Sequence, residues 1–198
     1  RLWTTDINYT NFDDEGKDVT VSSSGEVAVT GSSGTEALLA QLDGTTGQDS
    51  LFNAALNGVD GKYGFIKIAD EYSGTDAGNL ANYYAGIAYL NTGKYTEAID
   101  YLSKFKSDDI VLGALAKGAI GDAYSQKNQP KEALENYLKA AESNKNDFTT
   151  PRFLLKAGKT ALTLGNKSDA LKYFTDIKEN YEATPEAASV DVLIGLAQ

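Results

Sequence analysis

The sequence predicts a mostly α-helical protein: a right-handed stack of antiparallel helix pairs over residues 48–198, preceded by a small β-rich arm or hairpin over residues 1–47. The first observation is a change of composition. Ser, Thr, Gly and Asp dominate the first 47 residues, whereas Ala, Leu, Lys, Glu and Tyr dominate the rest. The second is a set of small residues that recurs in phase along the second region. The Gly-Thr-Thr-Gly run at residues 44–47 is the expected boundary.

The arm carries a hairpin signal. Residues 18–22 and 26–30 each alternate apolar and polar side chains, and Ser23, Ser24 and Gly25 separate them. A further strand is expected within residues 3–12 and a short helix within residues 35–42. The apolar side chains expected to act in assembly are Trp3, Ile7, Tyr9, Val19, Val21, Val27 and Val29.

Beyond the arm, helical segments alternate with short turns, which favours helices that pack as antiparallel neighbours. The predicted helices cover residues 49–57, 62–72, 77–91, 95–105, 110–127, 131–143, 150–164, 168–180 and 185–197.

Small residues recur at fixed places in successive helix pairs. Gly86, Gly121 and Gly158 stand 35 and 37 residues apart in the first helix of each pair. A mid-helix Gly costs about 1 kcal/mol relative to Ala, so a close helix contact is expected at each. Alanines of the second helices are expected to face these glycines, and large side chains to fill the space between pairs. The alanines are Ala98, Ala133 and Ala170, and the large residues are Tyr89, Leu102, Tyr124, Tyr137 and Phe174.

This pattern resembles the tetratricopeptide repeat, which implies a right-handed helical solenoid that binds proteins. The resemblance implies a degenerate first repeat at 49–76, repeats at about 79–112, 114–147 and 151–184, and a capping helix at 185–197.

From Leu51 onward the chain is similar to periplasmic tetratricopeptide proteins that bacteria anchor by a single N-terminal membrane helix. The shared segments are residues 52–58, 77–86 and 194–198. The resemblance implies an accessory or assembly role in the cell envelope, at the periplasmic or extracellular surface of a bacterium. The chain has no Met, even at position 1, which favours a processed or trimmed chain. Membrane contact is expected only through a segment absent from this chain.

Composition excludes several functions. The chain has no Cys and no His, which removes thiol nucleophiles, imidazole bases and the usual zinc ligands. A net charge of −10 disfavours nucleic acid as a partner. We therefore expect no enzyme activity, no cofactor, no metal and no small-molecule substrate. The acidic run Asp13–Asp18 does not match the spacing of a calcium loop, and we interpret it as a solvated turn.

In the resembled family, peptides lie along a concave groove formed by the first helices of the pairs. The resemblance places the groove positions at Tyr83, Ile87, Leu90, Asp122, Gln126, Lys159 and Leu162. For Tyr83 and Leu90, packing against the helices of residues 49–72 is the alternative. A clamp for a terminal carboxylate is not expected, because Gly118 and Asp122 occupy two of its places.

The expected partner is a protein, and above all another copy of this chain. An isolated hairpin is marginally stable in water, so the arm needs an external surface, either its own solenoid or a neighbour. Three functions follow: a scaffold that engages its own copies through the arm, a subunit of an extracellular homopolymeric filament, or a periplasmic accessory factor that binds a client peptide in the groove.

Overall fold

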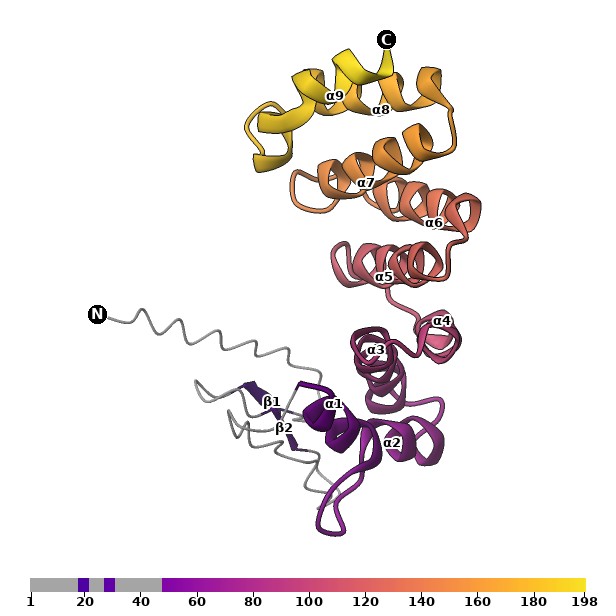
Figure 1. Ribbon diagram of the computed structural model, residues 1–198. Helices are drawn as coiled ribbons and strands as arrows, with labels where there is room; N and C mark the ends of the chain where they lie inside the picture. Colours follow the sequence, from indigo (N-terminus) through magenta and orange to yellow (C-terminus); the bar gives the residue numbers. More distant parts are fainter. Residues whose placement is uncertain (1–17, 22–26, 31–47) are drawn as a thin grey trace, which may run out of the picture. The chain divides into compact units, whose positions relative to one another are not determined.

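The computed structural model describes residues 18–21, 27–30 and 48–198 (Figure 1). The chain divides into two compact units, Arg1–Gly93 and Lys94–Gln198, and each is described by itself. This division falls within the predicted repeat at 79–112, between its two helices. The boundary predicted at residues 44–47 lies outside the described residues and stays a prediction.

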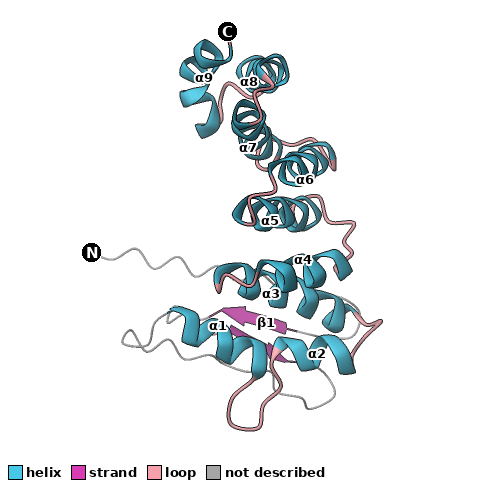
Figure 2. Cartoon of the chain, turned by 45° about the vertical axis from the view of Figure 1, so that its right-hand side comes forward, coloured by secondary structure: helices cyan, strands magenta, loops and turns pink. Residues whose placement is uncertain are grey.

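In its described residues, the first unit contains a short hairpin and three helices. Strands β1 and β2 pair antiparallel, with Val19 opposite Val29 (Figure 2). The strand expected within residues 3–12 and the helix expected within residues 35–42 lie outside the described residues, so the arm as a whole stays a prediction. The elements are β1 Asp18–Val21, β2 Val27–Thr30, α1 Gln48–Asn57, α2 Phe65–Glu71 and α3 Asp76–Asn91.

The second unit is a succession of helices, each packed on its neighbour in the sequence (Figure 1). This order, α4 on α5 through to α8 on α9, is that of a stack in which contacts are local along the chain. The elements are α4 Tyr95–Lys104, α5 Leu112–Gln126, α6 Pro130–Glu142, α7 Thr150–Thr163, α8 Lys167–Asn180, a 3-10 helix Pro185–Ser189 and α9 Val190–Ala197.

Left-handed residues end the first helix of each pair. Gly93, Asn128 and Gly165 occupy equivalent positions, with φ of 75°, 57° and 78°. Glycine adopts this conformation without steric cost, and Asn is among the few other residues that tolerate it. The second turn therefore keeps the geometry of the others although its sequence lacks glycine.

Two helix starts differ from the prediction by three residues or more. Helix α2 begins at Phe65 rather than at 62, because the buried Gly64 is extended, with φ −83° and ψ 172°. The segment 185–197 was expected to form a single helix. Its first five residues form a 3-10 helix instead. The Thr184 hydroxyl donates to the carbonyl of Tyr181 at 2.7 Å and makes no cap.

The helix contacts in the second unit correct the predicted packing. Aromatic rings of the second helices lie over the glycines within each pair, rather than between pairs. A Cβ placed at Gly121 would lie 2.6 Å from two ring carbons of Tyr137, and 3.2 Å from the carbonyl oxygen of Ala133. At Gly158 the covering ring belongs to Phe174. Each glycine makes room for a ring, and Ala133 approaches through its backbone.

The contact between successive pairs uses a glycine that the sequence did not single out for packing. A Cβ at Gly118 of α5 would overlap the ring of Phe153 of α7. Phe153 is fully buried in the core of the second unit. Gly118 therefore lets the next pair approach, as Gly121 does for its own pair.

Candidate functional site

The predicted groove position Asp122 joins three helices. Its carboxylate, on α5, accepts a hydrogen bond of 2.8 Å from the Tyr137 hydroxyl of α6. The Nζ of Lys156, on α7, donates to both carboxylate oxygens at 2.6 and 2.7 Å. The side chains of Lys156 and Asp122 are 33% and 34% exposed. Asp122 thus links successive helix pairs and still presents part of its surface to solvent.

The electrostatics of this cluster keep Tyr137 protonated. Burial raises the pKa of the Tyr137 hydroxyl, and the charge of Asp122 and the hydrogen bond to it raise it further. The neutral hydroxyl can therefore donate to Asp122 at neutral pH, and Lys156 balances the carboxylate charge. Sequence reasoning identified Asp122 as a groove residue but missed both partners, because a contact across three helices leaves no local pattern.

The other predicted positions of the second unit differ in exposure. Gln126 of α5 and Lys159 of α7 are exposed, so both can contact a partner. Leu162 of α7 is half-buried and packs against the core of the unit. Leu162 therefore contributes to stability, whereas Gln126 and Lys159 can contribute to binding.

The remaining predicted positions, Tyr83, Ile87 and Leu90, lie on α3 in the first unit and are half-buried. The ring of Tyr83 meets that of Tyr84 edge to face, with centroids 5.4 Å apart. Tyr84 in turn stacks on Phe65 of α2 at 5.4 Å. It is therefore Tyr84 that stacks on the helix of Phe65, and both interpretations of Tyr83 stay predictions. The structure thus places three of the seven predicted positions on α3 and four on α5 and α7.

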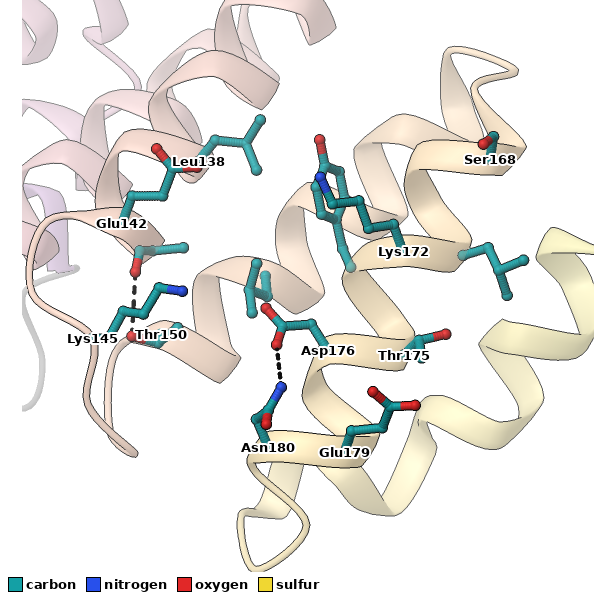
Figure 3. A pocket seen from close by; sticks show the side chains of 14 residues that line it. Leu138, Glu142, Lys145, Thr150, Ser168, Lys172, Thr175, Asp176, Glu179 and Asn180 are labelled. Atoms are coloured by element: carbon teal, nitrogen blue, oxygen red, sulfur yellow. Dashed lines mark hydrogen bonds between the residues drawn. The ribbon is translucent and has the colours of Figure 1, made fainter.

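A pocket that the sequence did not predict lies among α6, α7 and α8 (Figure 3). It is open to solvent, with a volume of about 610 Å³. Its lining combines leucines with charges of both signs. The leucines are Leu138, Leu154 and Leu171, and the charged residues are Glu142, Lys145, Lys172, Asp176 and Glu179.

Hydrogen bonds hold parts of the pocket wall in place. The Nδ2 of Asn180 donates to Asp176 at 2.7 Å, and the hydroxyl of the buried Thr150 donates to the carbonyl of Ala141 at 3.2 Å (Figure 3). Burial raises the pKa of Tyr173, with smaller contributions from Asp169 and Glu142. The pocket can therefore offer apolar contacts and charged hydrogen-bonding groups to a ligand.

Two further properties concern the described residues alone. Within residues 18–21, 27–30 and 48–198, no three acidic side chains gather closely enough to hold a metal ion. Nor does any helix in those ranges have the length and apolarity needed to cross a membrane. The acidic run at residues 13–18 lies outside the described residues apart from Asp18.

The successive helix pairs define a helical-repeat protein. Family models of the tetratricopeptide repeat match residues 80–109, 114–147 and 153–183. The chain therefore carries three tetratricopeptide repeats between residues 80 and 183. Repeats of this family are typically non-catalytic modules of protein–protein interaction. A search of curated proteins found no match to the chain.

Proposed function

We propose that the chain is a non-catalytic interaction scaffold of the bacterial cell envelope or surface, and that it engages other copies of itself through its N-terminal arm. The observation that carries the proposal is the run of three tetratricopeptide repeats over residues 80–183. Stacked repeats of this kind form extended surfaces that bind other polypeptides.

The sequence of the arm supports self-association. Its valines stand at alternate positions of the two segments, so one face of a hairpin would be apolar and in need of cover. A neighbouring copy can supply this cover by strand addition or by packing. A head-to-tail contact between copies extends into a fibre unless its rotation closes a ring. A homopolymeric extracellular filament is the extended form of this proposal.

The location in the envelope is supported by the resemblance of residues 51–198 to anchored periplasmic tetratricopeptide proteins. The lack of Cys is compatible with export, since the chain needs no particular redox state.

The second candidate function is an accessory factor that binds a client peptide in the concave groove. The exposure of Gln126 and Lys159 and the partial exposure of Asp122 favour it. Charge reversal by Lys159→Glu should then weaken peptide binding and leave self-association unchanged. Lys131→Glu, at an exposed position of α6 outside the groove and the pocket, is the matched control.

Deletion of residues 1–47 tests the main proposal. The full chain should sediment as assemblies, and the deleted chain should sediment as a monomer with unchanged helix content by circular dichroism. If the deleted chain still assembles, the arm does not join the copies.

A further inference from the structure

The terminal helix α9 is in phase with the first helices of the preceding pairs. Gly121, Gly158 and Gly195 are each 37 residues apart. The rings that cover the first two come from residues sixteen positions later, Tyr137 and Phe174. A Cβ at Gly195, in contrast, would meet nothing within 4 Å. Helix α9 thus stands where the first helix of a further pair would stand. Within the described residues, no second helix covers its glycine.

The open glycine lies on an exposed apolar face. Val192 and Leu196 are 71% and 59% exposed, and both neighbour Gly195 on one side of the helix. The opposite side, with Val190 and Ala197, is buried against the rest of the second unit. Helix α9 therefore has two apolar faces, and only the inner one is packed within the described residues.

The order of helices in the stack indicates what should cover this face. After each first helix comes a second helix, and after that the first helix of the next pair. In the second helices α4, α6 and α8 a small Ala precedes a large side chain by four residues, and the next first helix begins ten, thirteen and sixteen residues after that large side chain. A candidate from this chain should therefore have a small residue four positions before a large one, with a first helix that begins ten to sixteen residues later.

The sequence just before α1 has this spacing. Gly34 precedes Leu38 by four residues, and α1 begins at Gln48, ten residues after Leu38. Leu42, four residues after Leu38, would lie on the same side of a helix. Residues 34–42 thus match a second helix that precedes α1.

We propose that residues 34–42 of a second copy pack on the outer face of α9, over Gly195, and complete a helix pair between two molecules. This inference rests on the proposed self-association through the arm, and it identifies the surface of the neighbouring copy that the arm binds. Residues 43–47 span at most about 18 Å, so this docking brings α1 of the second copy to α9. The order of first and second helices then continues from one molecule into the next.

Cysteine crosslinking tests the contact in the full chain, because the protein has no native Cys. The double variant Leu38→Cys/Gly195→Cys should form a ladder of disulfide-linked dimers, trimers and longer species under mild oxidation. The control Leu38→Cys/Ile110→Cys, with an exposed second site, should not. A crosslink confined to the monomer, or a ladder equal to that of the control, would overturn the proposal.

A second variant separates this inference from the proposed function. Leu196→Asp should weaken self-association of the full chain at least tenfold, with an unchanged circular-dichroism spectrum. Lys131→Gln, which makes the same charge change on α6, should leave association unaltered. If deletion of residues 1–47 abolishes association and Leu196→Asp does not, the arm acts elsewhere and this inference fails while the proposed function stands. If neither change matters, both fail.

Discussion

At the scale of residues, glycine and aromatic side chains form matched contacts. Gly121 and Gly158 each lie under a ring from the second helix of the pair, and Gly118 lies under a ring from the next pair. An interior this closely packed tolerates little added volume at these places. The helix pairs therefore depend on the absence of a Cβ at three positions of the second unit.

Replacement of Gly121 by Leu should lower the free energy of unfolding by about 1–3 kcal/mol, because the new side chain would collide with the Tyr137 ring. Gly195→Leu, compared in dilute protein in which copies do not associate, is the matched control, since a Cβ there meets nothing within 4 Å. Urea unfolding of both variants, followed by circular dichroism, measures the difference. Equal stability of the two variants would remove the packing argument.

Tyr137→Phe should cost about 1–3 kcal/mol at pH 7, because it removes a hydrogen bond to a charged carboxylate. The pKa of Tyr137 is higher in the folded than in the unfolded chain. Its contribution to stability is therefore complete below the ordinary tyrosine pKa of about 10 and declines as the pH rises above it. The stability gap between wild type and variant should narrow between pH 9 and 11. A gap that stays constant over this range would contradict the assigned pKa shift.

At the scale of elements, the links between helix pairs decide whether the unit behaves as one stack. The Phe153 ring against Gly118 and the Asp122–Lys156 ion pair both join α5 to α7, across the intervening α6. The ion pair is partly desolvated and bidentate at the carboxylate, which distinguishes it from pairs within one exposed helix. These contacts couple the stability of one repeat to that of the next.

A double-mutant cycle with Asp122→Asn and Lys156→Gln should give a coupling free energy of about 0.5–1 kcal/mol, reduced by added salt. The more exposed pair Asp100–Lys104 lies within α4 and provides the control. Its expected coupling is about 0.2 kcal/mol, the lower end of the range for charged side chains four residues apart on one helix. If the Asp122–Lys156 coupling is no larger than that of the control, the ion pair does not join the repeats.

At the scale of the whole molecule, the sequence predicted the helices better than their contacts. Periodicity and turn residues place α3 to α8 within about two residues, because each helix carries its own pattern. The 3-10 turn at Pro185–Ser189 was missed, because Thr184 has a typical capping sequence but makes its hydrogen bond to Tyr181 instead.

The contacts that define candidate sites depend on residues far apart in the chain. Lys156, thirty-four residues from Asp122, and the lining of the pocket among α6, α7 and α8 have no local signal in a single sequence. The register of Gly195 could have been found from the repeat spacing alone. Its exposure could not, because exposure depends on which helices pack against α9.

The most direct test of the central claim, a tetratricopeptide scaffold that joins copies of itself, is sedimentation of the purified full chain over a wide range of concentration. We expect a helix-rich protein whose average mass rises with concentration and exceeds that of a dimer, as head-to-tail contacts require. A chain of 21.1 kDa that stays monomeric at the highest concentration would contradict the claim.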